Sequence, residues 1–407
     1  MGLLTTLKQN DVFRDEKSLA FDGTNDYVDC GTNFESTLLN SDFSFSIWVK
    51  FVDGRPPSTD LYMFGTKDGN DNFWFRIETD GDVAFYYKEG TTQSNLVASG
   101  YLADGASNWI HFVGTLSDSA QKIYANGVVI ASGTASLDTS GFAQDTNRNL
   151  VIGARNNAGT VGNYLPCNIS EVAFYTTVLT INQVKTIYNG REPYNHKEGV
   201  ASGNLQAWYR MGDGSLDDYA ILTDETNATK SSDLSPNATF DTNTTGWSSY
   251  SSGDANTLSR DTTIKRTGSG SLKVVFGASN GGWAVQNSSN VVGVSANKLL
   301  VIEGYVYIPS GSYNGGHPFF TDGSSFVGAS IEGVTYASSS ITDQWQFMRT
   351  VSTLTSDTSG RFYVYTTGTD PSENDIIYLD DIKIYQINGN AGGMINMSAT
   401  DIEGDTP

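Results

Sequence analysis

The stretch DFSFSIWVKF, residues 42–51, alternates its side chains with a period of two. One set of alternate positions holds Phe43, Phe45, Ile47, Val49 and Phe51, and the other holds Ser44, Ser46, Trp48 and Lys50. Successive side chains of an extended strand point to opposite faces of a sheet. The stretch therefore predicts a half-buried β-strand, with its apolar set turned toward a hydrophobic core.

The same period recurs on both sides of this stretch, between residues 17 and 200. Further strands are predicted at 73–77, 82–87, 109–116, 121–131, 149–155 and 168–175. The run 121–131 reads as two short strands around Asn126-Gly127, which is a strong hairpin signal. A helix capped by Thr180 is predicted, with an apolar stripe of Ile181, Val184 and Ile187. Many strands and one peripheral helix predict a sandwich of two sheets.

A second set of alternating runs lies between residues 234 and 388. Its strands are predicted at 271–276, 298–308, 344–352, 361–366 and 376–387. The connections are rich in Gly, Ser and Asn, which favour turns. The fold class is therefore expected to be all-β, with two antiparallel β-sandwich domains.

The composition narrows the possible function classes. The 407 residues carry 24 Lys and Arg against 45 Asp and Glu, a formal charge of −21. Nucleic-acid binding needs clusters of basic side chains, so no nucleic-acid partner is expected. Residues 1–19 lack the basic start and apolar core of an export signal, and no run has the length of a membrane span. No membrane insertion is expected either.

The two cysteines, Cys30 and Cys167, do not have the spacing of a metal site. Both fall in predicted strands of the first region. They predict either one disulfide or two separate buried thiols, and the sequence leaves both interpretations open.

The sequence contains no recognisable catalytic arrangement. Glycoside hydrolysis needs two carboxylates at a defined separation. The pattern Glu-x-Asp-x-x-Glu on one strand is missing, because Glu78-Thr79-Asp80 lies at a predicted turn and lacks the third acid. The three histidines, His111, His196 and His317, are not near a nucleophile motif. A non-enzymatic protein is predicted.

The first region resembles a known family along most of its length. Residues 18–31, SLAFDGTNDYVDCG, resemble the opening strand of laminin-G-like, concanavalin A-type domains, and the runs FSFSIWVKF, IYANGVVIASG, NLVIGA and ISEVAFYTTVLTINQVKTIYN resemble their later signatures in the same order. The resemblance implies a jelly-roll sandwich that binds glycans or proteins, often with calcium on its rim. Asp68, Asn70 and Asp71 offer the hard oxygen ligands that calcium prefers. A solvated turn is the alternative interpretation of this loop.

The second region resembles jelly-roll carbohydrate-binding modules. The matching landmarks are Asn237, Phe240, Trp247, Gly268-Ser269-Gly270-Ser271-Leu272, Trp345 and Asp380-Asp381. The resemblance implies a structural calcium ion that bridges the first and last strands. Asp241 and Asp380 match its ligands, with Asp381 as a substitute for the latter. An exposed Asp pair at a strand end is the alternative.

Sugar binding by this second region needs an aromatic platform with polar groups around it. The candidates in or near its predicted loops are Trp283, Gln286, Tyr313, His317 and Tyr336. For each of these residues, the alternative interpretation is packing in the core or at its rim.

Two separated segments, 204–223 and 388–407, together resemble a tail that closes laminin-G-like proteins of tailed phages. Residues 224–387 then read as an insertion into that tail, which a surface turn tolerates. The expected organisation is an anchor segment at 1–16, a first sandwich at 17–233, an inserted jelly roll at 234–388, and a tail at 389–407 that returns to the first sandwich.

This resemblance implies a phage structural protein on the virion surface, in a capsid decoration or tail appendage, that attaches to host or environmental polysaccharide. Its expected partners are other virion proteins and glycans, and a homo-oligomer is expected. The expected anchor contacts are Leu3, Leu4, Leu7, Val12 and Phe13. A secreted bacterial glycan-binding or adhesion protein and a polysaccharide-degrading enzyme are the alternatives.

Overall fold

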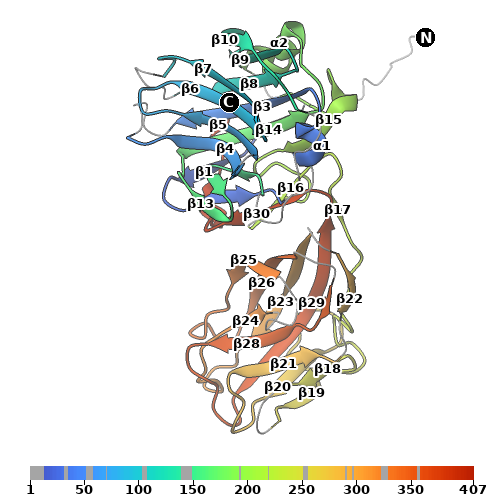
Figure 1. Ribbon diagram of the computed structural model, residues 1–407. Coiled ribbons are helices and arrows are strands. Elements are labelled where there is room, and N and C mark those ends of the chain that lie inside the picture. Colours follow the sequence, from blue (N-terminus) through green and yellow to red (C-terminus); the bar gives the residue numbers. More distant parts are fainter. Residues whose placement is uncertain are drawn as a thin grey trace, which may run out of the picture. The chain divides into compact units, whose positions relative to one another are not determined.

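The computed structural model describes residues 13–31, 35–51, 58–69, 71–102, 108–138, 149–191, 194–218, 220–250, 255–288, 291–295, 298–321, 329–354 and 358–407. Within these residues the chain is nearly all-β, and its α-helices, α1 (Glu35–Leu39) and α2 (Ile181–Tyr188), are short (Figure 1). Almost every strand pairing is antiparallel. The predicted fold class is confirmed.

The chain divides into two compact units. The first unit contains Met1–Thr226 and Met397–Pro407, and the second contains Asn227–Asn396. The sequence predicts 234–388 for the second unit, whereas the structure begins it at Asn227 and ends it at Asn396.

One sheet of the first unit has β3 near its centre. The strand order is β10-β9-β8-β3-β14-β1-β31, and β15 also pairs with β14. The strands are β1 (Ser18–Asp22), β3 (Phe43–Phe51), β8 (Ile110–Leu116), β9 (Ala120–Ala125), β10 (Val128–Thr134), β14 (Pro166–Tyr175), β15 (Leu205–Tyr209) and β31 (Ile402–Glu403). The predicted hairpin at 121–131 is confirmed, because β9 and β10 flank Asn126 and Gly127, both at positive φ.

The facing sheet of the first unit contains the strands β2, β11, β4, β5, β6 and β7 in that spatial order. Their bounds are β2 (Tyr27–Asp29), β4 (Leu61–Asp68), β5 (Asp71–Ile77), β6 (Val83–Glu89), β7 (Thr92–Ala98) and β11 (Val151–Ile152), with β12 (Arg155–Asn157) and β13 (Thr160–Gly162) beside β4 and β16 (Ile221–Thr223) in the same unit.

Aromatic rings fill the space between these two sheets. The ring of Phe45 on β3 lies 4.9 Å from that of Phe64 on β4 and 5.0 Å from that of Phe85 on β6. Gly114 on β8 makes room for it, because a Cβ at this position would lie 2.2 Å from the Phe45 ring. Edge-to-face packing of this kind adds about 0.5–1.5 kcal/mol per ring pair beyond the buried area.

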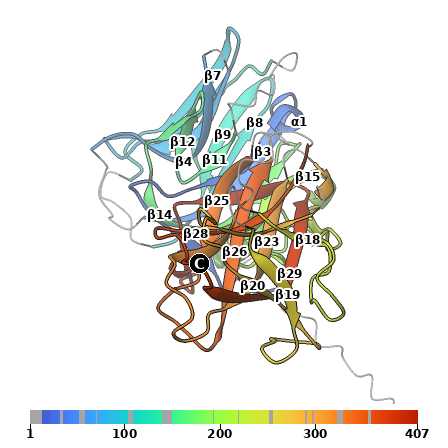
Figure 2. The same cartoon turned by 90° about the horizontal axis from the view of Figure 1, so that it is seen from below.

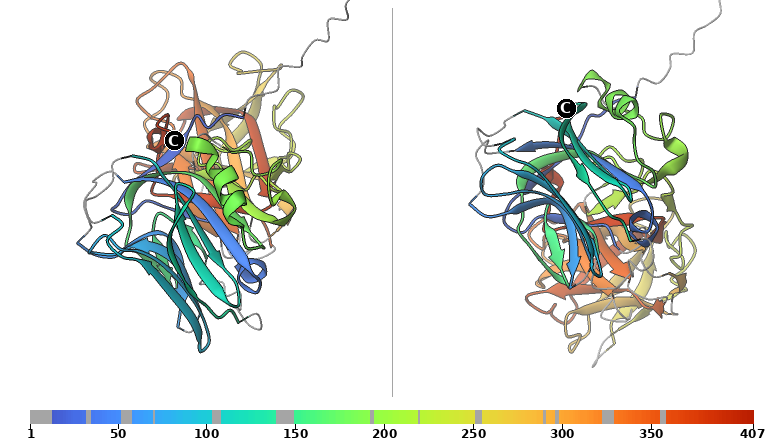
Figure 3. Two further views of the ribbon diagram at one scale, coloured as in Figure 1. Left: turned by 90° about the horizontal axis from the view of Figure 1, so that it is seen from above. Right: turned by 45° about the horizontal axis from the view of Figure 1, so that its top comes forward.

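The strand β3 is buried on both faces, whereas its alternation predicts a half-buried strand. Ser44, Ser46 and Trp48 are all buried. Ser46 bonds to the buried His111 at 2.8 Å, and the Trp48 ring lies 5.8 Å from that of Tyr188 in α2. The helix and the chain around it cover the second face of the sheet (Figure 3). This cover comes from residues more than 100 positions away, which a local pattern does not register.

The helix α2 begins where the sequence predicts, after the capping residue Thr180. The Thr180 side chain accepts a hydrogen bond from the Gln183 amide, and the Gln183 side chain bonds back to the Thr180 amide. Val184 and Ile187 are buried against the sheet. This reciprocal cap satisfies two N–H groups at the start of the helix.

The second unit is a sandwich of a larger and a smaller sheet. The larger follows the order β19-β20-β29-β23-β26-β25, with β17 beside β29, and the smaller follows β18-β21-β28-β24. Figure 2 shows β23, β26 and β29 side by side. The larger sheet contains β17 (Thr229–Lys230), β19 (Thr257–Asp261), β20 (Ser271–Val275), β23 (Leu299–Tyr307), β25 (Ala329–Thr335), β26 (Trp345–Leu354) and β29 (Ile376–Asn388). The smaller contains β18 (Trp247–Ser249), β21 (Trp283–Asn287), β24 (His317–Thr321) and β28 (Tyr363–Thr367). The pair β22 (Val291–Val294) and β27 (Thr358–Gly360) and the strand β30 (Ala391–Ile395) belong to the same unit.

The core of the second unit is largely aliphatic. Leu300, Ile302 and Val306 of β23 and Ile382 and Ile384 of β29 face the smaller sheet. Fewer aromatic rings are therefore needed to fill this interior, and the outer faces of the two sheets carry many of the unit's rings.

The last residues of the chain return to the first unit. β31 pairs with β1, Asp405 forms an ion pair with Lys50, and the Trp109 indole donates a hydrogen bond to Asp405 at 3.2 Å. Cys30 and Cys167 are separate buried thiols, and burial raises the pKa of Cys167. The disulfide interpretation is therefore wrong.

Candidate functional site

The outer face of the smaller sheet in the second unit carries a row of aromatic rings. Phe319 on β24 pairs with Tyr365 on β28, and Tyr365 pairs with Trp283 on β21. The ring centroids are 5.7 Å apart in the first pair and 4.6 Å apart in the second. Residues at one register position share a face of the sheet, so the three rings form a row across three strands.

Three more rings extend this row at both of its ends. The Tyr250 ring lies 5.0 Å from Trp283, the Tyr363 ring lies 5.3 Å from Trp283, and the Tyr336 ring lies 5.0 Å from Phe319. Tyr336 is 50% exposed and Tyr250 is 38% exposed, while the four rings between them are half-buried. We call these six residues the aromatic stripe: Tyr250, Trp283, Tyr363, Tyr365, Phe319 and Tyr336.

Alternation along the strands explains why these rings face outward. In β28 the buried Val364 and Thr366 alternate with the half-buried Tyr363 and Tyr365. Val364 and its neighbour Phe320 on β24 belong to the core. Because the core is filled from the opposite face, the rings of the stripe are not needed to close it.

A hollow of about 300 Å³ lies at the Tyr336 end of the stripe. It is lined by His317, Tyr336, Ala337, Ser338 and Thr367. The His317 Nδ1 atom accepts a hydrogen bond from the Ser339 amide at 3.0 Å. The neutral imidazole therefore carries its proton on Nε2, which makes it a donor at the edge of the stripe.

A polar pair lies beside Tyr363 on the same face. Gln286 pairs with Tyr363 in register, and its Oε1 accepts a hydrogen bond from Arg361 Nη1 at 3.3 Å. Hydroxyls, an amide, a guanidinium and an imidazole thus border a row of rings. This combination suits a ligand with apolar faces and many hydroxyl groups.

The structure brings together four of the five predicted glycan-binding residues. Trp283 and Tyr336 are in the stripe, and His317 and Gln286 border it. Tyr313 lies elsewhere: it packs against the core, its hydroxyl donates to the Gly316 carbonyl at 2.9 Å, and burial raises its pKa.

Four rings of the stripe were not among the sequence candidates: Tyr250, Phe319, Tyr363 and Tyr365. The alternation in RFYVYT, residues 361–366, marks two of them as outward-facing. Their alignment with Trp283 depends on a register shift between Trp283 and Val285, which no local pattern reveals.

The predicted calcium ligands of the second unit bind a loop of the protein itself. The buried Asp380 accepts hydrogen bonds from the amides of Arg266 at 2.9 Å, Thr267 at 3.3 Å and Asp381 at 2.9 Å. Asp241 accepts bonds from the Ser269 amide and hydroxyl and from the Thr239 hydroxyl, and these bonds lower its pKa. N–H groups direct positive charge at both carboxylates. The arrangement does not fit a calcium ion that bridges the two carboxylates, because their hydrogen bonds to residues 266–269 already link them through the protein itself.

The predicted calcium loop of the first unit lies partly outside the described residues. Asn70 and the side chain of Asp68 are not described, and Asp71 accepts a hydrogen bond from the Gly90 amide at 3.1 Å. Calcium at this loop remains a prediction.

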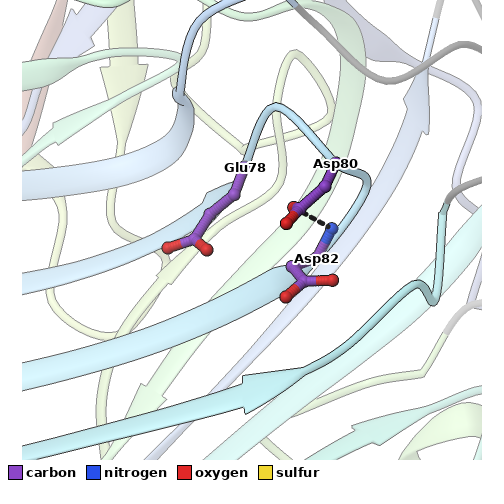
Figure 4. A group of neighbouring side chains, drawn as sticks. All are labelled: Glu78, Asp80 and Asp82. Carbon is purple, nitrogen blue, oxygen red and sulfur yellow. Dashed lines mark hydrogen bonds between the residues drawn. The ribbon is translucent and has the colours of Figure 1, made fainter.

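Glu78, Asp80 and Asp82 approach one another at the turn between β5 and β6 (Figure 4). The structure thus adds Asp82 to the Glu78–Asp80 pair, which lacks a third acid in the sequence pattern. Glu78 is paired with Arg76, and Asp82 accepts bonds from the Gly100 amide and the Ser99 hydroxyl. The carboxylates of Glu78 and Asp82 thus already have partners within the protein, as is ordinary for acidic residues at a turn.

Of the predicted anchor residues, only Phe13 lies in the described part of the chain; Leu3, Leu4, Leu7 and Val12 do not. The Phe13 ring lies 5.7 Å from that of Trp208 in the first unit, and the Arg210 guanidinium lies 4.4 Å above it. Phe13 thus packs on its own unit, and the anchor role remains a prediction.

Part of the first unit matches the model of a known family. Residues 22–185 match the family model described as the concanavalin A-like lectin/glucanases superfamily. A comparison with curated proteins found no match. None of the described helices has the length and hydrophobicity to cross a bilayer.

Several solved structures are similar in fold. The carbohydrate-binding module CBM40 of a Ruminococcus gnavus sialidase is 16% identical, with 43% of this chain and 98% of that chain covered and a TM-score of 0.36. A xylan-binding CBM22 domain from Paenibacillus barcinonensis is 17% identical, with 37% and 93% covered and a TM-score of 0.27. A carbohydrate-binding protein, described as putative, from Bacteroides ovatus is 16% identical, with 53% and 56% covered and a TM-score of 0.38. At these scores no ligand is carried over to this chain.

Proposed function

We propose that the chain is a non-enzymatic glycan-binding protein and that the aromatic stripe holds an extended, neutral sugar chain. The observation that carries this proposal is the continuity of the stripe, in which each ring lies about 5 Å from the next. Pyranose rings present apolar C–H faces to aromatic rings, while their hydroxyls turn to the side. Gln286, Arg361 and His317 border the stripe where these hydroxyls lie.

The rings require little ordering when a ligand binds. Each is packed against a neighbouring ring, and four of the six lie on strands, so their rotamers are already restricted. Binding then costs less side-chain entropy than it does on mobile loops. Affinity should rise with the length of the sugar chain until every ring is covered.

Titration calorimetry of the full chain with neutral β-linked oligosaccharides of two to six units tests this proposal. Trp283→Ala should weaken binding roughly 30-fold, the effect of a central aromatic anchor worth about 2 kcal/mol. Tyr101→Ala is the control, because this exposed tyrosine belongs to the first unit and should leave binding unchanged. Equal binding by both variants would reject the stripe as the site.

The biological setting that we propose is the virion surface, as a capsid decoration or tail appendage with other virion proteins as partners. Its support is the resemblance of residues 204–223 and 388–407 to the tail of phage laminin-G-like proteins. Mass spectrometry of purified particles and of culture medium separates this setting from a secreted adhesion protein. Copies in intact particles support the first, and copies in the medium alone support the second.

The absence of catalysis is part of the proposal and has its own test. A reducing-sugar assay on the polysaccharides that bind should show no release above a buffer blank. Release that persists after further purification would favour the polysaccharide-degrading alternative.

A further inference from the structure

The outer face of the larger sheet, on the other side of the second unit from the aromatic stripe, has a different pocket. Its volume is about 330 Å³, and its lining includes Arg266, Glu303, Tyr305, Phe347, Asp381 and Lys383. These residues come from the 266–267 loop and from the neighbouring strands β23, β26 and β29. We call it the charged pocket.

Hydrogen bonds from the 266–267 loop to two aspartates fix the wall of this pocket. Asp380 holds the amides of Arg266 and Thr267, and the next residue, Asp381, sits at a bulge with φ of +51°. The bulge turns the Asp381 carboxylate toward the loop, where Arg266 Nη1 and Thr267 Oγ1 donate to it at 2.5 Å and 2.6 Å. A bulge commonly redirects one side chain in this way.

The same loop places the Arg266 guanidinium over an aromatic ring. Its Cζ lies 3.5 Å from the centroid of Tyr305, and the Phe347 ring meets Tyr305 edge-on at 5.3 Å. Among the described residues, no group bonds to Arg266 Nε or Nη2. These N–H groups remain for a ligand, on a guanidinium that needs no further ordering.

The acids of the pocket already have cationic partners. Glu303 accepts bonds from Arg349 Nη2 at 2.7 Å and from the Tyr385 hydroxyl at 3.0 Å, and Asp381 is paired with Arg266. Lys383 stands opposite Glu303 in register, is exposed, and forms no ion pair with any residue that the structure describes. When Arg349 beside the pocket is counted, three cations accompany the two acids of the pocket, and Lys383 is the cation that neither acid pairs with.

A second lysine, Lys230, adds positive charge near the charged pocket. Lys230 Nζ lies 3.3 Å above the Tyr385 ring. Burial chiefly lowers the pKa of Lys230, and the charges of Lys383 and Arg349 lower it further, while Glu303 and Asp233 oppose them. Lys230 is thus within electrostatic range of Glu303, Lys383 and Arg349, and an added anion would lessen the repulsion among the three cations.

We propose that the charged pocket binds an anionic sugar residue, whose carboxylate or sulfate contacts Lys383 and Arg266 and whose ring lies against Phe347. A sugar carries both the apolar ring face for Phe347 and the anionic group for the two cations. This site is separate from the aromatic stripe and does not depend on the function proposed for it.

Titration of the full chain with three tetrasaccharides and one salt tests the proposal. The tetrasaccharides are a uronate tetramer, a sulfated galactan tetramer and a neutral xylose tetramer, and the salt is sodium sulfate. At least one anionic tetramer should bind, more tightly than sodium sulfate and less tightly as salt is raised. A preference for the uronate identifies the anionic group as a carboxylate, and a preference for the galactan identifies a sulfate.

Lys383→Gln should weaken binding of that anionic tetramer about fivefold, and Arg266→Gln about tenfold. Lys265→Gln is the matched control, since it removes the same charge from an exposed residue next to Arg266 that does not line the pocket. Binding of the xylose tetramer should not change in any of the three variants. An unchanged melting temperature for Lys383→Gln separates lost binding from lost folding.

The proposal is overturned if neither anionic tetramer binds, or if Lys265→Gln weakens binding as much as Lys383→Gln. It is also overturned if Trp283→Ala abolishes anionic binding while Lys383→Gln does not, because the ligand would then lie on the stripe. If Trp283→Ala weakens only the binding of the neutral xylose tetramer, the result supports the charged pocket as a separate site.

Discussion

The two units place their aromatic rings in opposite locations. Among the residues that the structure describes, the largest fully buried side chains all belong to the first unit: Tyr62, Tyr87, Tyr175, Tyr209, Phe43, Phe45, Phe64, Phe73, Phe75, Phe85 and Phe112. In the second unit the interior is mainly Val, Leu and Ile, and six rings form a row on an outer face. Aromatic rings hold the first sandwich together, whereas in the second they are available to a ligand.

The two units also differ in the balance of their acidic and basic residues. Residues 227–396 carry nine Lys and Arg against fourteen Asp and Glu, while the rest of the chain carries fifteen against thirty-one. Most of the acidity therefore belongs to the first unit. A strongly acidic surface repels anionic ligands, so an anionic sugar should meet less repulsion at the second unit.

The largest expected effect comes from the aromatic core of the first unit. Phe45→Ala should lower the free energy of unfolding of that unit by about 4 kcal/mol, because the cavity left among Phe64, Phe75 and Phe85 cannot collapse. Denaturant unfolding measures this loss. Glycan binding below the transition should stay unchanged, and a parallel loss of binding would contradict the division of roles.

A ring of the stripe should show the reverse behaviour. Tyr365→Val removes the ring at the middle of the stripe and keeps a side chain suited to a strand. Binding of a neutral hexasaccharide should weaken by about 2 kcal/mol, roughly 30-fold, with less than about 1 kcal/mol lost from stability. Tyr336→Ala, at the end of the row, should cost less. Equal losses at both positions would mean that the ligand does not run along the stripe.

Sequence patterns anticipated elements whose neighbours are close along the chain. The alternation of residues 42–51 identified β3, and Asn126-Gly127 marked the β9–β10 hairpin. The capping residue Thr180 and the apolar set of Ile181, Val184 and Ile187 identified α2, although Ile181 is exposed. These features depend on one or two turns of local backbone, which the residue types themselves determine.

What the sequence could not provide was the register between distant strands. Trp283, Phe319 and Tyr365 are up to 82 positions apart, and they form one row because β21, β28 and β24 pair with a particular offset. Tyr313 looked equivalent to Tyr336 in the sequence, yet one packs on the core and the other is exposed. The charged pocket also depends on the bulge at Asp381.

The first unit should also respond to pH through its buried acids. Burial chiefly raises the pKa of Asp15 to about 9 and of Glu171 to about 7, and the two charges also repel. Because both folded pKa values exceed the ordinary ones, the folded state binds more protons than the unfolded state. The contribution of these two acids to the stability of the first unit is therefore highest at low pH and falls as the pH rises from about 4 toward 9. The buried His111 and His196 act in the opposite sense, because burial lowers their pKa values from 6.5 to about 3 and they favour unfolding as the pH falls below about 6.5.

Asp15→Asn tests this dependence. The amide keeps a partner for the Ser170 hydroxyl and removes one buried charge. The first unit should become more stable at pH 8 by about 1 kcal/mol, a value reduced for the partial exposure of Asp15, and should change little at pH 4. Thermal melts at both pH values measure the difference. A variant that is equally destabilised at both would show a structural role without titration.

The smallest expected effect is a response of thermal stability to calcium, which should differ between the two units. A calcium ion at the first unit's loop of Asp68, Asn70 and Asp71 should stabilise that unit by about 0.8 kcal/mol at a calcium concentration three times the Kd. EDTA should then lower the first unit's melting temperature, and added calcium should restore it. The second unit should not respond, because the amides of the 266–269 loop already engage Asp380 and Asp241. A response of the second unit alone would reverse this assignment, since only an ion held by Asp380 and Asp241 would then explain it.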